Sequence, residues 1–112
     1  MTAEQEAVET ARALASKKAE DVKIYDVRGI SGLTDYYVAA TGSAAPHLKA
    51  LAAEVQNSAR AAGIAPGRVC GEPDSGWSVI DRLDVVVHVF SPEARAYYAL
   101  EKLWADARQV AF

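Results

Sequence analysis

Several features that would assign a chemical class or a compartment are scarce in this chain of 112 residues. Its single cysteine, Cys70, cannot form a disulfide within the chain, and no Cys and His residues near it have the spacing of a zinc site. No apolar run approaches the ~20 residues that a membrane helix needs. The first residues are acidic, without the basic and apolar regions of a secretion signal. We therefore expect a soluble protein of a reducing compartment, the cytoplasm.

An excess of positive charge is also missing. The chain has 12 Lys and Arg against 15 Asp and Glu, a net charge of -3, and the two signs are interleaved. Non-specific binding to nucleic acid needs clustered Lys and Arg, so a broad phosphate-binding surface and direct sequence-specific nucleic-acid binding are disfavoured. If the protein acts on a machine built from nucleic acid, we expect it to contact a basic protein there.

Residues 84–104 carry the clearest structural pattern. Val85, Val87 and Val89 alternate with Val86, His88 and Phe90, so both faces of the strand are apolar, as in a central strand. Ser91 is a good N-cap and Pro92 suits the first helical position, so a helix is predicted next. Its apolar stripe, predicted to pack on the sheet, is Ala96, Tyr97, Leu100, Leu103, Trp104 and Ala107. The face predicted to meet water carries Arg95, Tyr98, Glu101, Lys102 and Asp106.

The remaining elements follow from periodicity and turn residues. Thr2 and Gln5 form a capping-box pattern before an Ala-rich helix that runs to about Lys18. Alternation predicts strands near residues 22–27, 36–41, 68–72 and 77–81, and helical spacing predicts a second helix that ends before Gly63. The fold class is therefore α/β (α+β), a mixed sheet of about five strands packed with helices. We expect one domain over residues 1–112, with an N-terminal helix at 1–20 and a core at 21–107. The first helix has a shallow stripe that could pack on the sheet, on a second copy, or on nothing.

The candidate catalytic residues are weakly arranged. Thr41, Gly42 and Ser43 precede a helix and could offer N–H groups to a phosphate, but the spacing is not that of a P-loop, and a tight turn explains the glycine equally well. Two metal-binding carboxylates on one strand face need an Asp-x-Asp spacing, whereas this chain has Asp81 and Asp84.

The two histidines do not change that assessment. His88 is expected to be a satisfied core residue, and His47 is expected to bond Ser43 at the start of the helix. No nucleophile elbow is present. Catalysis, a metal and a cofactor are all disfavoured.

A partner-binding surface is the alternative use of the chain's polar and aromatic residues. Trp77 begins a short strand, and it could be a cover for the core or an interface anchor. Tyr98 stands among charges, and it could lie over a neighbouring turn or contact a partner. The candidate partner-binding residues are Asp74, Trp77, Asp81, Arg95, Tyr98 and Glu101.

The residues from about Val22 to Trp104 resemble the ribosomal silencing factor family, also called Iojap-like. The pattern consists of Leu33-Thr-Asp-Tyr-Tyr-Val-Ala-Ala-Thr-Gly-Ser43, His47, Gly63-Ile-Ala-Pro66, Gly71-Glu72, Gly76-Trp77, Asp81, Asp84-Val-Val-Val-His-Val-Phe90 and Tyr98-Ala-Leu-Glu-Lys-Leu-Trp104. One departure is Leu83, where the family often has glycine. The resemblance implies a nucleotidyltransferase-like fold without a known catalytic role.

The resemblance also implies a function. Family members bind the large ribosomal subunit through ribosomal protein L-fourteen, block subunit joining and repress translation when nutrients are scarce, and they are seen as homodimers when free. Two other functions stay open from the residues alone: a metal-dependent nucleotidyl or phosphoryl transferase that uses residues 41–43, and a dimeric scaffold that acts elsewhere. A transferase would bind nucleotide with a divalent metal, whereas a silencing factor would change the profile of ribosomal subunits without either.

Overall fold

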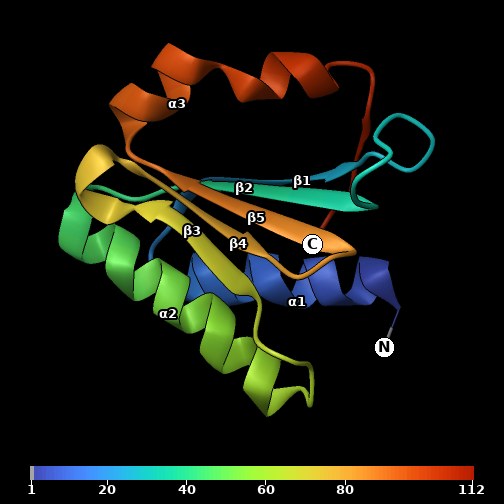
Figure 1. Cartoon of the computed structure of the whole chain (residues 1–112), viewed down its shortest axis with the longest axis horizontal. Coiled ribbons are helices and arrows are strands. Elements are labelled where there is room, and N and C mark those ends of the chain that lie inside the picture. Colours follow the sequence, from blue (N-terminus) through green and yellow to red (C-terminus); the bar gives the residue numbers. More distant parts are fainter. Residues whose placement is uncertain (1) are drawn as a thin grey trace.

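A mixed six-stranded sheet forms the middle layer of the protein, with helices on both of its faces (Figure 1). The computed structural model describes residues 2–112. The sequence predicted about five strands, and the additional strand has only two residues, too few to show an alternating pattern. In spatial order the strands are β3 (Arg68–Glu72), β4 (Trp77–Asp81), β5 (Val85–Phe90), β2 (Tyr36–Thr41), β1 (Glu20–Asp26) and β6 (Arg108–Gln109).

The strand β5 lies inside the sheet, as its two apolar faces predicted. It runs parallel to β2, where Val87 is opposite Val38, and antiparallel to β4, where Val87 is opposite Ile80. The side chains of all three residues are fully buried. Because strands on both sides occupy its backbone groups and helices cover its faces, β5 is the strand around which the sheet is built.

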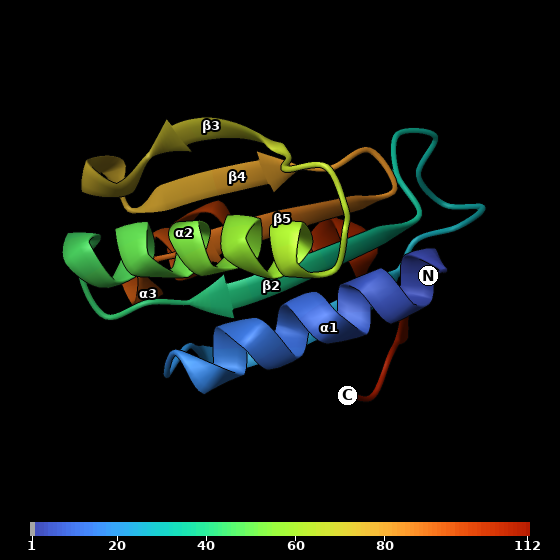
Figure 2. The same cartoon turned by 90° about the horizontal axis from the view of Figure 1, so that it is seen from below.

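The helix α1 (Ala3–Ser16) covers part of one face of the sheet (Figure 2). It begins with the predicted capping box, because Thr2 Oγ1 accepts the Gln5 N–H and Gln5 Oε1 accepts the Thr2 N–H. Ala7 and Leu14 are fully buried in the core on this face. The small alanine side chains let α1 lie close to the strands, so the shallow stripe packs on the sheet.

The helix α2 (Ala45–Ala61) lies beside α1 on the same face (Figure 2). Gly42 precedes it without a side chain, and a Cβ there would lie 2.7 Å from Leu48 Cδ2. Glycine therefore allows the turn to pack against the first turns of the helix. At the other end Gly63 has φ 74, the left-handed conformation that ends helices and that the sequence predicted. The buried face of α2 is Leu48, Leu51, Val55 and Ala59.

The opposite face of the sheet carries a shorter layer, α3 (Pro92–Tyr98) followed by the 3-10 helix η2 (Leu100–Trp104) (Figure 1). Ser91 caps α3 as predicted, since its Oγ accepts the Ala94 N–H at 3.1 Å. The prediction of one continuous helix was wrong. Ala99 adopts a left-handed conformation with φ 48 and ψ 40, and α3 ends there.

The break at Ala99 changes which side chains face the sheet. Trp104 is buried against Tyr25, Val27 and Ala39, with Leu100 and Ala107 beside it, as the predicted stripe requires. Ala96, Tyr97 and Leu103 were predicted in the same stripe, but all three are exposed, Tyr97 at 82% and Leu103 at 72%. A turn of opposite hand between two short helices rotates the second relative to the first, so a single helical stripe cannot describe both. Within residues 2–112, no helix has the length and apolar character needed to span a bilayer.

Candidate partner-binding surface

Two of the predicted contact residues, Trp77 and Tyr98, meet although they come from different elements. Trp77 begins β4 and Tyr98 ends α3, and their ring centroids are 4.9 Å apart. Tyr98 is 47% exposed and Trp77 is partly buried, so the pair presents aromatic area to solvent. Tyr98 in turn contacts Tyr97 edge to face, with centroids 5.1 Å apart. Such amphipathic rings are typical anchors of protein interfaces.

Two side chains of β5, Phe90 and His88, hold the Trp77 ring in place. Its ring stacks on Phe90, with centroids 5.6 Å apart, and its indole Nε1–H donates to His88 Nδ1 at 3.2 Å. Burial lowers the pKa of His88 to about 4, so at neutral pH the imidazole is uncharged and can accept this bond. His88 is therefore a satisfied residue of the aromatic layer, as the sequence predicted.

The turn just before Trp77 requires glycine at position 76. Gly76 has φ 83, and a Cβ on it would lie 2.7 Å from Ser91 Oγ. The Gly76 carbonyl accepts the Ser91 N–H at 2.8 Å, which ties the start of β4 to the start of α3. The local backbone therefore fixes the relative position of Trp77 and the helix that carries Tyr98.

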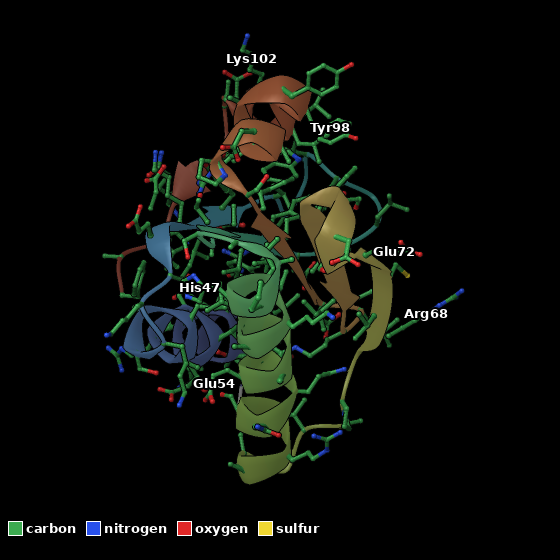
Figure 3. The ribbon with its side chains drawn as sticks, turned by 90° about the vertical axis from the view of Figure 1, so that its left-hand side faces the viewer. His47, Glu54, Arg68, Glu72, Tyr98 and Lys102 are labelled. Atoms are coloured by element: carbon green, nitrogen blue, oxygen red, sulfur yellow. The ribbon has the colours of Figure 1, made fainter. Side chains whose placement is uncertain are left out.

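Carboxylates border the aromatic pair. Asp74 lies in the 3-10 helix η1 (Pro73–Ser75) just before Trp77, and it is exposed. Glu72 is exposed and is the cross-strand partner of Trp77, and Figure 3 shows it on β3 on the same side of the molecule as Tyr98. Sequence reasoning missed Glu72, because its position depends on the register of β3 and β4. We call Glu72, Asp74, Trp77, Tyr97 and Tyr98 the aromatic-acidic patch.

Asp81 lies away from this patch at the other end of β4. It faces the same side of the sheet as Trp77, because the two positions differ by an even number, but at ~3.3 Å per residue they are about 13 Å apart. Its Oδ1 accepts the Leu83 N–H at 2.9 Å. Asp81 therefore also has a local role in the turn that joins β4 to β5.

Arg95 and Glu101 bind each other instead of facing solvent, which corrects the sequence-based view of them as water-facing. Arg95 Nε lies 2.6 Å from Glu101 Oε1, and Arg95 Nη2 lies 2.9 Å from Glu101 Oε2. Arg95 Nη1 donates to Thr41 Oγ1 and to the Asp21 carbonyl, each at 2.8 Å. The Tyr25 hydroxyl also donates to Glu101. These bonds engage most of the polar atoms of the two side chains within the protein.

The pKa shifts of Arg95 and Glu101 agree with a partly buried ion pair between them. Burial opposes the charged form of Arg95, but the contacts with Glu101 outweigh it and raise the Arg95 pKa. Burial likewise opposes the Glu101 carboxylate, but hydrogen bonds from Arg95 and Tyr25 outweigh it and lower the Glu101 pKa. Both side chains are therefore charged at neutral pH, and each neutralises the other.

The turn at residues 41–43 uses its N–H groups inside the protein. The Gly42 N–H donates to the Phe90 carbonyl at 2.8 Å, and the Ser43 N–H donates to His47 Nδ1 at 2.9 Å. His47 Nε2 lies 2.8 Å from the Lys17 carbonyl, so the ring links the end of α1 to the start of α2. These contacts leave neither N–H free for a phosphate. Asp81 and Asp84 flank a turn, and within residues 2–112 no three His, Cys, Asp or Glu side chains are grouped as metal ligands would be.

Comparisons with known proteins match the whole chain to one family. A family model described as "Ribosomal silencing factor during starvation" covers residues 1–112. A protein of Bacillus subtilis named ribosomal silencing factor RsfS is 40% identical over 97 residues, which cover 87% of this chain and 82% of that protein. The chloroplastic protein Iojap of Arabidopsis thaliana is 32% identical over 106 residues, 93% of this chain and 43% of the plant protein.

Solved structures extend the similarity to three dimensions. A crystal structure of a protein from Chromobacterium violaceum superposes with a TM-score of 0.89 at 31% identity and covers 100% of this chain and 92% of its own. A structure from Bacillus halodurans gives a TM-score of 0.80 at 38% identity, with coverage of 96% and 99%. The α/β fold predicted from the sequence is thus the fold of these relatives.

Proposed function

The chain belongs to the ribosomal silencing factor family, and from this premise we propose that it binds the large ribosomal subunit and prevents the small subunit from joining. The proposed contact is ribosomal protein L-fourteen, and the proposed outcome is repression of translation in the cytoplasm when nutrients are scarce. The observation that carries this proposal beyond family membership is the aromatic-acidic patch, where the Trp77–Tyr98 pair presents aromatic area to solvent beside two exposed carboxylates.

The charge of the patch suits a basic partner. Glu72 and Asp74 are exposed beside the rings, and the whole chain has a net charge of -3. Ribosomal proteins are generally basic because they pack against RNA. Opposite charges at a rim mainly speed and orient association, while desolvated rings supply most of the affinity. Asp81 faces the same side of the sheet, within the reach of an interface of standard size, so we include it as a rim contact.

The proposed mechanism is steric and needs no chemical step. The molecule measures 32 × 32 × 23 Å, so even its thinnest dimension far exceeds the contact distance between two packed surfaces. A bound copy on the joining face would hold the two subunits apart for as long as it stayed. The family is one of regulatory factors. A transferase gains no support from residues 41–43, because the N–H groups of Gly42 and Ser43 are hydrogen-bonded within the protein.

The decisive experiment is a sucrose-gradient profile of purified ribosomal subunits with and without the protein. We expect the protein to migrate with large subunits and to reduce the fraction of joined ribosomes. Trp77→Ala and Tyr98→Ala should each weaken binding by ~1 to 3 kcal/mol, as loss of an interface anchor does. The matched control is Phe112→Ala, because Phe112 is also a half-exposed aromatic residue, at 45%, but lies at the C-terminus outside the patch. Unchanged co-migration of the folded Trp77 and Tyr98 variants would refute the proposed surface.

We also propose that the free protein is a homodimer, as members of this family are expected to be. Leu103 supports this, because it is large, apolar and 72% exposed on η2, outside the aromatic-acidic patch. Light scattering behind a sizing column measures the mass directly. A monomer at micromolar concentration would contradict the homodimer without affecting the proposed ribosome contact.

A further inference from the structure

The break between α3 and η2 decides which aromatic rings the protein exposes. In one continuous helix, Tyr97 and Leu103 would share a stripe with Leu100 and Trp104 and turn toward the sheet. With the break, Leu100 and Trp104 pack inward, whereas Tyr97 and Leu103 point to solvent and Tyr98 contacts Trp77. The Gly76–Ser91 hydrogen bond fixes the start of α3, and the bend at Ala99 then decides how the end of α3, which carries Tyr97 and Tyr98, lies on the sheet.

Ala99 does not favour that conformation by itself. It has φ 48, a left-handed conformation in which the Cβ of an L-residue crowds the following carbonyl. Alanine is also the residue that most favours continuing an α-helix. No glycine or proline lies between Pro92 and Trp104 to impose a break. Contacts elsewhere must hold the bend.

The Arg95–Glu101 ion pair spans the bend. Arg95 lies in α3 and Glu101 in η2, and two parallel N–H···O bonds of 2.6 and 2.9 Å join them. Such a bidentate pair fixes distance and orientation together. The pair is also anchored to the sheet, because Arg95 donates to Thr41 in β2 and Glu101 accepts from Tyr25 in β1. Below it, Trp104 stacks on Tyr37 with centroids 4.1 Å apart.

We propose that Arg95 and Glu101 are positioning residues: their ion pair holds the bend at Ala99 and thereby presents Tyr98 against Trp77 to the partner. The identity of that partner rests on the function proposed above, whereas the bend itself is a property of the free protein. The two residues then affect binding without touching the partner, although their charges alone would place them in the contact surface.

The test is rescue of one substitution by another. Arg95→Met removes the ion pair, and Ala99→Gly favours the same bend by a different route, because glycine accepts positive φ and disfavours a continuous helix. We expect Arg95→Met to weaken binding to large subunits about tenfold, toward the lower end of what loss of an anchor costs. We expect the Arg95→Met, Ala99→Gly double variant to recover most of that affinity, and Ala99→Gly alone to bind as the unchanged protein does.

A second variant leaves both charges in place. Ala99→Val puts a β-branched residue where φ is positive, so it opposes the bend while Arg95 and Glu101 remain. It should lower affinity as Arg95→Met does. If Arg95→Met does not fold, Ala99→Val still tests the proposal.

A measurement on the free protein separates this inference from the proposed function. The ring proton shifts of Tyr98, read by NMR, report its contact with Trp77 without any ribosome. They should change in Arg95→Met and Ala99→Val and return in the double variant. Unchanged shifts in Arg95→Met, or an affinity loss that Ala99→Gly does not rescue, would overturn the positioning role. If Tyr98→Ala binds large subunits as tightly as the unchanged protein, the proposed partner surface is wrong. The NMR result on the bend is unaffected by that outcome.

Discussion

At the scale of single residues, His88 links the stability of the protein to its contact surface. It is only 7% exposed, and burial lowers its pKa to about 4, against about 6.5 for a free imidazole. Its Nδ1 accepts the Trp77 indole N–H, which a protonated ring could not do. Protonation of His88 would thus remove one of the bonds that hold Trp77.

The pH dependence of unfolding follows from this shift. Between pH 6.5 and about 4 the unfolded chain binds a proton at His88 that the folded protein does not. The free energy of unfolding should therefore fall as pH drops through this range, by up to about 3 kcal/mol from this residue. His88→Gln keeps an acceptor for Trp77 but does not titrate. Urea unfolding at pH 7, 5.5 and 4 should show a shallower fall in His88→Gln, and equal slopes for the two proteins would contradict the assignment.

Two residue pairs of the candidate site differ in how far they could be predicted from the sequence. The Trp77–Tyr98 pair could be anticipated, because rings at a strand start and on a polar helix face are unusual. The Arg95–Glu101 pair could not, because two charges on a polar stripe look solvent-exposed until the bend brings them together. Their further partners, Tyr25 and Thr41, are distant in the sequence.

At the scale of elements, the turn that joins β4 to β5 contains a strained residue. Leu83 has φ 71, although it is not glycine. The turn is fixed by hydrogen bonds on either side, from the Leu83 N–H to Asp81 Oδ1 and from the Asp84 N–H to the Arg82 carbonyl, each at 2.9 Å. The exposed leucine side chain does little to offset the strain.

Replacing that residue should therefore stabilise the fold. A left-handed conformation costs an ordinary residue ~1 to 2 kcal/mol, while glycine loses ~0.4 to 1 kcal/mol through the greater freedom of the unfolded chain. Leu83→Gly should raise the free energy of unfolding by about 0.5 kcal/mol in urea titration. Leu83→Ala is the control, since it removes the exposed side chain but keeps the Cβ that causes the strain. If Leu83→Gly is no more stable than Leu83→Ala, backbone strain at position 83 does not destabilise the protein.

Most elements could be predicted because their signals are local. β2 and β5 have the predicted bounds, since their apolar runs end at turn residues, and both capped helices start where their caps indicate. The strand β6 and the bend at Ala99 escaped prediction for one physical reason. Each is stabilised by contacts with a distant segment. In β6, Gln109 lies opposite Tyr25, and at the bend, Arg95 bonds Thr41 and Glu101 bonds Tyr25.

At the scale of the whole molecule, the sheet separates two surfaces with different expected roles. The rings of the aromatic-acidic patch, Trp77, Tyr97 and Tyr98, lie at α3. The helices α1 and α2 cover the opposite face of the sheet (Figures 1 and 2). Figure 3 shows Tyr98 and Glu54 of α2 on well-separated parts of the molecule. If the patch binds the large subunit, the part of α2 around Glu54 lies away from that contact.

A steric block makes a specific prediction for this outward face. If the bound domain keeps the small subunit out by its volume alone, as proposed, no particular charge on α2 is needed. Lys49→Glu and Glu54→Lys together reverse two charges of α2 and leave the net charge of the protein unchanged. At equal occupancy of large subunits, this double variant should inhibit subunit joining as strongly as the unchanged protein in light-scattering assays. If it binds normally but no longer inhibits, α2 makes a specific contact with the small subunit, and exclusion by volume alone is not the mechanism.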